Sequence, residues 1–396
     1  MNYILFDENI VRTNLLPLTF TRPVSDIRIG ILTIREKWEK RLKASTSSLT
    51  DSYLSAKYPI VKMAENVLIN GSICPNDEII AAVKNLKPNQ TVVYNDTIIA
   101  LHVTAEELDN IGEASSQGIE EIQMSAAPLK ISHTWEIFSK NDLALREDFA
   151  LLTKGRKSQK LSDTNRVAGA ENIFVEKGAS VEFAILNGST GPIYIGKDAE
   201  IMEGTVIRGP FALCEHAQVK MSAKIYGATT IGPYCRVGGE INNSVLLGYS
   251  NKAHDGFLGH SVIGEWCNLG ADTNTSNLKN TYDHVRLWSY GKQTFVNTHL
   301  QFCGLIMGDH SKCAINTMFN TGTVVGVSAN IFGPGFQRNF IPSFTWGGTS
   351  GHTNYTIKKA MEVAEIVFKR RGRTFDEIER DLLTNVYTLT LKNKYL

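Results

Sequence analysis

The sequence contains few of the features that mark secreted, membrane-spanning or nucleic-acid-binding proteins. Its six cysteines form no CxxC pair, so a zinc site is not expected. Scattered thiols of this kind predict a reducing compartment. No apolar run reaches the ~18 residues of a membrane span, and the first residues do not resemble a signal peptide. The 41 basic and 40 acidic residues leave a net charge of +1, which predicts no nucleic-acid partner and no membrane partner. We therefore expect a cytoplasmic protein with small-molecule partners.

Glycine is scarce in the first 165 residues, which contain only five of the chain's 32. This change in composition divides the 396 residues into two differently built parts, and two domains also suit the length. The polar, basic stretch at residues 154–160 is typical of an exposed linker. We therefore place the first domain boundary at residue 160.

Short β-rich runs alternate with helical patterns in residues 1–160, which predicts an α/β domain with a largely parallel sheet. A capping box at Thr104 and Glu107 marks the start of the third predicted helix. A longer helix at about 135–153 is expected to lead out of the domain. The predicted strands are 3–6, 67–69, 91–94 and 98–103, and the predicted helices are 33–42, 77–86 and 105–111.

Aliphatic residues recur every six positions in the second part of the chain. Three sides of six residues make a triangular coil, and stacked coils bury the aliphatic residues in one continuous core. This predicts a left-handed parallel β-helix over residues 161–345, with Phe257 as an inward residue where the period resumes. A loop or irregular coil is expected at 275–296, and two helices at 355–371 and 375–383 in a C-terminal tail over 346–396. The clearest run of the period is Ile195, Ile201, Ile207, Leu213, Val219, Ile225, Ile231 and Val237.

Residues 250–277 place histidines, asparagines and small residues beside this repeat. Histidine suits the removal of a proton from an amine, because its ordinary pKa lies near neutrality. His254 is the candidate base, and His260 is its local competitor. The alternative is a purely structural solenoid.

The same segment resembles the acetyltransferase half of the bifunctional glucosamine-1-phosphate N-acetyltransferase / N-acetylglucosamine-1-phosphate uridyltransferase (GlmU) family. In that family a lysine and a histidine precede an aromatic residue, Leu-Gly, an Ile-Gly-x-x-x-Asn-Ile-Gly-Ala-Gly-Thr run and a further asparagine. This sequence departs from the family where Phe257 and Leu278 replace tyrosines, and where Asp283 lies near the position of a lysine. The matching positions are His254, Phe257, Asn268, Ala271 and Asn277.

The resemblance implies an acetyl-CoA-dependent N-acetyltransferase of UDP-N-acetylglucosamine biosynthesis. It implies an amino sugar phosphate as acceptor, with glucosamine 1-phosphate expected, and a homotrimer. It further implies that His254 is the general base and that Ala271 and Thr298 line the acetyl-CoA slot. The implied substrate-binding residues are Arg208, Lys252, Phe257, Asn268 and Asn277. The alternatives are that the asparagines only form turns, that Arg208 is solvated, and that Ala271 and Thr298 are ordinary corner residues.

The N-terminal residues resemble the opening of the sugar-1-phosphate nucleotidyltransferases, with an arginine after the first strand and a Pro-Leu-Thr run at 17–19. The resemblance implies that Arg12 and Arg22 bind a nucleotide, with Mg²⁺ if the domain is active. No glycine precedes Gly30, so the usual backbone cradle for phosphates is missing. The domain is also shorter than the family's, and no carboxylate pair identifies metal ligands. A decayed loop kept for folding or regulation is the alternative.

Three hypotheses follow from the sequence. The first is the N-acetyltransferase, coupled to a nucleotidyltransferase-like N-terminal domain. The second is a sugar-1-phosphate nucleotidyltransferase, using UTP or dTTP, whose β-helix is structural. The third is a non-catalytic assembly protein that binds a nucleotide sugar. The acceptor sugar, the nucleotide base and the activity of the N-terminal domain stay open at this level.

Overall fold

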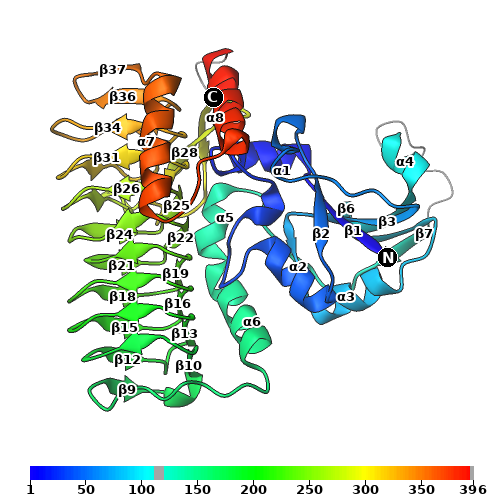
Figure 1. The fold of residues 1–396 in the computed structure, drawn as a ribbon, viewed down its shortest axis with the longest axis horizontal. Coiled ribbons are helices and arrows are strands. Elements are labelled where there is room, and N and C mark those ends of the chain that lie inside the picture. The colour runs from blue at the N-terminus through cyan, green and yellow to red at the C-terminus, as the bar shows by residue number, and fades with distance from the viewer. Residues whose placement is uncertain (111–119, 393–396) are drawn as a thin grey trace. The chain divides into compact units, whose positions relative to one another are not determined.

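The computed structural model describes residues 1–110 and 120–392. The chain forms two compact units. The first unit comprises residues 1–15, 22–27 and 32–132, and the second comprises 16–21, 28–31 and 133–396. The predicted fold class is confirmed, because an α/β part precedes a parallel β-helix that ends in two helices (Figure 1).

The first unit is built on a six-stranded sheet with the order β2-β1-β3-β6-β5-β7. β1 pairs in parallel with β2 and β3, and β5 pairs in parallel with β7, whereas β6 is antiparallel to β3 and β5. The strands are β1 (Asn2–Phe6), β2 (Thr46–Leu49), β3 (Glu65–Asn70), β5 (Gln90–Tyr94), β6 (Thr97–Thr104) and β7 (Glu120–Gln123), with a separate pair β4 (Ile73–Cys74) and β8 (Leu129–Lys130). The helices are α1 (Asn9–Asn14), α2 (Ile34–Leu42), α3 (Asp77–Lys84) and α4 (Ala105–Asp109). The capping box predicted at Thr104 is present, and Ile111 of the predicted helix lies outside the described residues.

The β-helix of the second unit has three faces of stacked strands, which are parallel except that β37, the last strand of face 2, pairs antiparallel with its neighbour β36. Face 1 consists of β10 (Ile173–Val175), β13 (Ile193–Ile195), β16 (Phe211–Leu213), β19 (Thr229–Ile231), β22 (Val245–Gly248), β25 (Val262–Glu265), β30 (Leu305–Met307), β33 (Thr323–Val325) and β35 (Phe340–Ile341). Face 2 consists of β11 (Ser180–Val181), β14 (Glu200–Ile201), β17 (Gln218–Val219), β20 (Arg236–Val237), β23 (Asn251–Lys252), β26 (Asn268–Leu269), β31 (Lys312–Cys313), β34 (Asn330–Ile331), β36 (Thr345–Gly348) and β37 (Gly351–Asn354). Face 3 consists of β9 (Arg166–Ala168), β12 (Ile185–Asn187), β15 (Val206–Arg208), β18 (Lys224–Tyr226), β21 (Glu240–Asn242) and β24 (Phe257–Gly259), followed by the pair β27 (Asn274–Thr275) and β32 (Met318–Phe319).

The residues of the six-residue period fill the interior of this prism, as predicted from the sequence. Ile201, Val219 and Val237, for example, lie above one another in register and are buried. The prediction is wrong at Phe257, because Leu258 is the inward residue and pairs with Ile241. The coils of this region hold fewer than eighteen residues, so the six-residue frame shifts by one position.

Two helices and two short N-terminal segments cover face 1. The helices are α5 (Thr134–Ser139) and α6 (Asn141–Thr153). The side-chain amide of Asn141 donates to the carbonyl of Ala228 at 2.9 Å and accepts from the backbone of Gly30 at 2.7 Å. The backbone of Ile31 donates to Asp148 at 2.8 Å. By its packing the chain therefore divides at residues 132 and 133, ahead of the boundary expected at 160.

The predicted interruption of the repeat is present as an excursion between β27 and β30. It contains an antiparallel hairpin of β28 (Arg286–Ser289) and β29 (Thr294–Asn297), whose Trp288 stacks on Phe340 at 4.3 Å. The C-terminal helices are α7 (Ile357–Arg370) and α8 (Glu377–Lys392), and α7 runs alongside face 2 (Figure 1). None of the helices in the described ranges is long and apolar enough to cross a bilayer.

Candidate functional site

A basic groove of about 550 Å³ lies between face 2 and the C-terminal end of α7. Its floor comes from β20, β23, β26 and β31, and its wall comes from the last turn of α7. Residues of interest that line it are Lys220, Arg236, His254, Asn268, Ala271, Lys312, Arg370 and Arg371. The groove therefore brings together three predicted site residues, His254, Asn268 and Ala271.

The floor of the groove is a column of outward side chains in register. Arg236 lies beside Asn251, Asn251 beside Asn268, and Asn268 beside Lys312 on successive strands. Each of them immediately precedes an inward residue of the repeat, so the pleat turns it away from the core. The stacking of coils thus collects polar residues that are far apart in the sequence.

A ladder of aromatic rings docks α7 on this face. Tyr249 stacks on Trp266 at 4.2 Å, and Trp266 stacks on Phe368 of α7 at 3.9 Å. Tyr249 and Trp266 both have a left-handed backbone, with φ of 53° and 60°, which repeats at the same corner in successive coils. The hydrogen bond from Arg371 to Asn251, at 2.8 Å, joins the end of the helix to the floor.

The charge of the groove is not compensated by the protein. Within residues 1–110 and 120–392, none of its five lysines and arginines forms an ion pair, and no carboxylate is among the residues that line it. Burial, together with repulsion from Arg236 and Arg370, lowers the pKa of Arg371. Burial also lowers the pKa of Lys312 to about 8. Like charges that crowd together without a counter-charge are typical of a site for an anion.

His254 lies exposed at the corner between faces 2 and 3, and its ring has no hydrogen-bond partner in the described part of the chain. The turn that carries it is held from inside the prism. Lys252 is only 2% exposed and occupies an inward position, in register with Val237. Its ammonium donates to the carbonyls of His254 and, at 3.0 Å, of Asp255, and burial lowers its pKa to about 8. Lys252 therefore contacts the backbone of the turn and does not line the groove.

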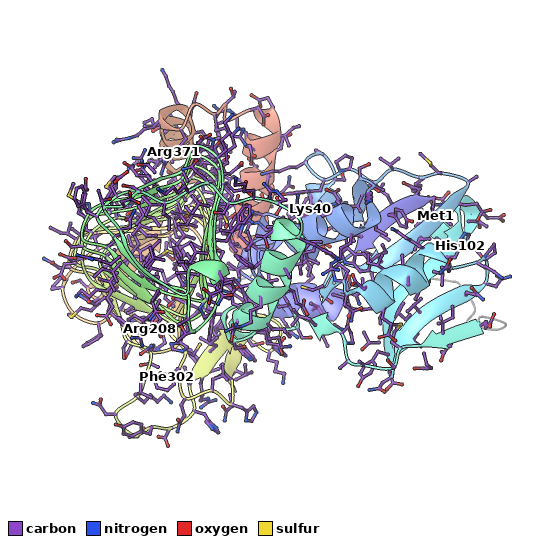
Figure 2. All side chains as sticks on the ribbon, turned by 90° about the horizontal axis from the view of Figure 1, so that it is seen from below. Met1, Lys40, His102, Arg208, Phe302 and Arg371 are labelled. Atoms are coloured by element: carbon purple, nitrogen blue, oxygen red, sulfur yellow. The ribbon has the colours of Figure 1, made fainter. Side chains whose placement is uncertain are left out.

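The other residues predicted from the resemblance lie elsewhere in the second unit. Arg208 and Phe257 are outward on face 3, and Figure 2 shows Arg208 and Arg371 on different sides of the β-helix. The amide of Asn277 contacts Nδ1 of His260 at 2.9 Å. Thr298 is buried in the excursion, where its hydroxyl donates to the carbonyl of Val285 at 2.8 Å.

In the first unit, Arg12 is enclosed by its own partners. Its guanidinium pairs with Asp7 at 3.0 Å and with Asp51 at 2.6 Å, and it donates to the hydroxyl of Tyr53 at 2.9 Å and to the carbonyl of Arg22 at 3.1 Å. Burial raises the pKa of Asp7, although Arg12 lowers it. A nucleotide would have to displace these partners to reach the fork of Arg12.

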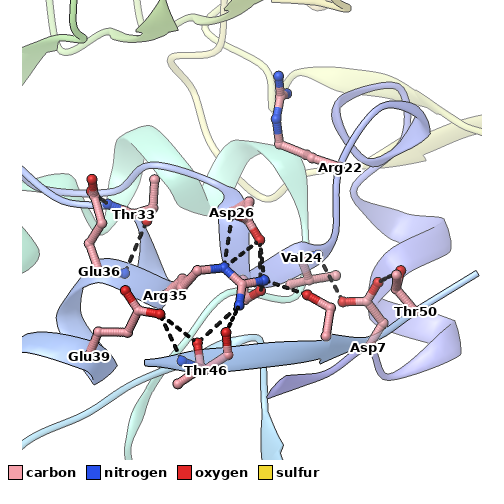
Figure 3. A network of polar contacts seen from close by, with 12 residues as sticks. Asp7, Arg22, Val24, Asp26, Thr33, Arg35, Glu36, Glu39, Thr46 and Thr50 are labelled. Atoms are coloured by element: carbon pink, nitrogen blue, oxygen red, sulfur yellow. Dashed lines mark hydrogen bonds and ion pairs between the residues drawn. The ribbon is translucent and has the colours of Figure 1, made fainter. Parts of the chain in front are cut away.

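Arg22 and a second arginine network lie nearby in the same unit. Figure 3 shows the side chain of Arg22 pointing away from the network around Arg35. Arg35 pairs with Asp26 at 2.6 Å and bonds to the hydroxyl of Thr46 at 3.0 Å. This second network ties α2 to β2 and consists of residues that satisfy one another.

A divalent cation such as Mg²⁺ would need several oxygen ligands from the protein. Among the residues that the structure describes, no three His, Cys, Asp or Glu side chains are placed to hold a metal ion together. The described residues of the first unit therefore do not fit a protein-only Mg²⁺ site.

Residues 3–157 match the sequence profile of a family described as sugar nucleotidyl transferase. No curated protein matches the chain. Among solved structures, the UDP-N-acetylglucosamine acyltransferase of Francisella novicida is 11% identical, with 59% of this chain and 85% of that chain covered and a TM-score of 0.27. A Bacillus cereus protein described as an acetyltransferase is 12% identical, with 55% and 90% covered and a TM-score of 0.18.

The chain is thus a transferase whose N-terminal part matches the sugar nucleotidyl transferases and whose second unit is a hexapeptide-repeat β-helix. This two-part organisation is similar to that of the GlmU family.

Sequence reasoning did not identify the cations of the groove. The signal for Arg236 and Lys312 was available, because each precedes an inward residue of the repeat. No comparable signal exists for Arg370 and Arg371, whose position depends on where α7 docks.

Proposed function

We propose that the second unit transfers the acetyl group of acetyl-CoA to the nitrogen of an amino sugar phosphate, with glucosamine 1-phosphate as the expected acceptor. The observation that carries this proposal is the groove itself, where five cations without a carboxylate partner lie beside His254. Acetyl-CoA brings several phosphate charges, which arginine binds well through its fork of donors.

The proposed chemistry follows from the groups in the groove. The amine attacks the thioester carbonyl, so a C–N bond forms and the C–S bond breaks. A ring nitrogen of His254 accepts the proton that the amine loses, and the proton later passes to the leaving thiolate of CoA. Asn268 offers an amide donor to the acceptor sugar or to the developing oxyanion, and Ala271 leaves room for the acyl chain.

We further propose that the active form is a homotrimer, with face 3 turned toward the neighbouring subunits. Face 3 carries exposed apolar side chains on successive strands, among them Ile185, Val206 and Tyr226. Light scattering at micromolar concentration tests this directly, and a strict monomer contradicts it.

The test of the acetyl transfer uses the full-length protein with acetyl-CoA and a panel of glucosamine 1-phosphate, glucosamine 6-phosphate and glucosamine. Release of the CoA thiol is followed in the wild type, His254→Ala and His260→Ala. We expect His254→Ala to lower the rate by about 10²–10⁴-fold, the usual contribution of a general base. If His260→Ala is the inactive variant, the base is misassigned, and if no acceptor is acetylated, the proposal fails.

A second activity is favoured by the family match of residues 3–157. We propose that the first unit transfers a nucleotidyl group to a sugar 1-phosphate. Pyrophosphate release with UTP or dTTP, Mg²⁺ and a set of sugar 1-phosphates measures this activity without acetyl-CoA. The absence of pyrophosphate release with every nucleotide contradicts it and leaves the first unit as a binding or assembly domain.

A further inference from the structure

A second hollow, of about 470 Å³, lies at another corner of the prism and shares no lining residue with the basic groove. It lies between α5, the corner at His260 and the segment that closes the excursion. Its lining includes Phe138, Asn243, His260, Gln301 and Phe302. Neither the acetyl transfer nor the nucleotidyl transfer proposed above uses this hollow.

The ring of His260 is held on three sides. Asn277 contacts Nδ1 at 2.9 Å, Phe138 meets the ring edge-on at 5.7 Å, and Phe302 stacks on it at 5.1 Å. The backbone is fixed as well, because Gly304 donates to the carbonyl of His260 at 2.9 Å. Among the described residues, Nε2 has no hydrogen-bond partner, so it is the ring atom left for a ligand.

The hollow carries little charge. Burial lowers the pKa of His260 to about 4, which keeps the imidazole neutral at physiological pH. The one carboxylate in the described lining, Asp142, forms an ion pair with Arg146 at 2.7 Å. No lysine or arginine is among the lining residues that the structure describes. An anionic ligand would therefore find no counter-charge here, in contrast to the basic groove.

The rim combines an apolar platform with polar groups. Phe302 is 42% exposed, although its ring also packs on His260. Gln301 and His299 are exposed next to it, and the amide nitrogen of Gln301 donates one hydrogen bond to the carbonyl of Tyr282 at 3.1 Å. A flat apolar surface beside neutral donors and acceptors complements a ring that has a C–H face and several hydroxyl groups.

We propose that this pocket binds an uncharged sugar ring, which lies against Phe302 and hydrogen-bonds to Nε2 of His260 and to the amide of Gln301. The site is independent of the acetyl transfer proposed above, because its lining and its charge are different. It would bind a glycosyl group that carries no phosphate at the contacting ring.

The test places 4-fluorophenylalanine at position 302 of the full-length protein and follows its ¹⁹F signal. The probes are the methyl glycosides of glucose, mannose and N-acetylglucosamine, and uracil as a planar ring that carries no sugar. Each glycoside is titrated up to about 50 mM. We expect at least one of them to shift the signal saturably with a millimolar Kd, the range typical of a small neutral ligand.

Two variants locate the binding. His260→Leu and Gln301→Ala should each weaken glycoside binding by about tenfold, because each removes one hydrogen bond to the glycoside. Gln301→Ala serves if His260→Leu does not fold, since Gln301 is exposed. Arg236→Gln in the basic groove is the matched control and should leave the titration unchanged. The proposal is overturned if no glycoside gives a saturable shift, if only uracil does, or if Gln301→Ala binds as the wild type does.

Discussion

In the first unit, Arg12 lies between Asp7 and Asp51, whereas the cations of the basic groove have no carboxylate partner in the described ranges. Arg12 is buried, whereas Arg236 and Arg370 of the groove are exposed and Arg371 is half-buried. In the first cluster each nitrogen of the Arg12 guanidinium donates to a partner within the chain, so the cluster stabilises the fold. In the groove the fold tolerates repulsion between Arg236 and Arg371, which the anion of our proposal would relieve.

We expect the largest loss of stability from a substitution at Arg12. Arg12→Gln leaves the buried carboxylate of Asp7 without its partner, so the free energy of unfolding should fall by about 3–5 kcal/mol. The control is Arg41→Gln, which removes an ion pair to the highly exposed Asp77 and should cost no more than about 1 kcal/mol. Urea unfolding followed by circular dichroism measures both. Equal losses in the two variants contradict the account of the first cluster.

Lys252 differs from both clusters, because its ammonium lies inside the prism and donates to two backbone carbonyls. Lys252→Met should remove the support of the turn at His254 and lower kcat by roughly 10–100-fold, because a small misplacement of a reacting group is costly. The KM for acetyl-CoA should not change, since Lys252 does not line the groove. Hydrogen exchange at residues 253–256 should become faster, and that readout does not depend on activity. If both the hydrogen exchange and kcat of the variant equal those of the wild type, Lys252 has no role in positioning His254.

The half-buried imidazole of His260 makes the stability of the fold depend on pH. Its folded pKa of about 4 lies below the ordinary 6.5, so the unfolded chain binds the proton more readily. The contribution of His260 to stability is therefore complete above pH 6.5 and is lost as pH falls toward 4. The free energy of unfolding of His260→Gln should fall less steeply over this window. Some slope remains in the variant, because burial also lowers the pKa of His133 and His352; identical slopes contradict the assignment.

The smallest expected effect is at Arg236. Arg236→Gln removes repulsion and no ion pair, so the free energy of unfolding should stay within about 0.5 kcal/mol of the wild type or rise slightly. Lys177→Gln, at an exposed position outside the groove, is the control. A loss as large as that of Arg12→Gln means that the groove arginine is structural, and the distinction between the two clusters disappears.

The interior of the β-helix could be predicted from the sequence, because the aliphatic residues of the six-residue period mark the positions that face inward. The prediction failed at Phe257 and Leu258, where short coils shift the frame, and a period counted along the chain cannot show such a shift until strands are paired. The basic residues of face 2 follow from the same register. The docking of Phe368 on Trp266 does not, because it joins α7 to a coil about a hundred residues earlier in the chain.

Only some of the predicted site residues lie together in the structure, because residues that are close in the sequence can lie at different corners of a coil. His254, Asn268 and Ala271 meet because they lie on adjacent coils at one edge. Asn277 lies beyond another corner and contacts His260, which separates two histidines that are close in the sequence. Spacing along the chain is a poor guide to proximity in a coil, where six residues lead to the next corner.

We propose that the basic groove binds the phosphates of acetyl-CoA. Calorimetric titration of acetyl-CoA and of acetyl-pantetheine, which lacks the nucleotide phosphates, tests it in the wild type, in Arg236→Gln/Arg371→Gln and in Lys177→Gln. Each lost charge-assisted contact should weaken acetyl-CoA binding by about tenfold or more, while acetyl-pantetheine binding stays the same. Lys177→Gln should bind both ligands as the wild type does. A double variant that binds acetyl-CoA as tightly as the wild type would contradict the account.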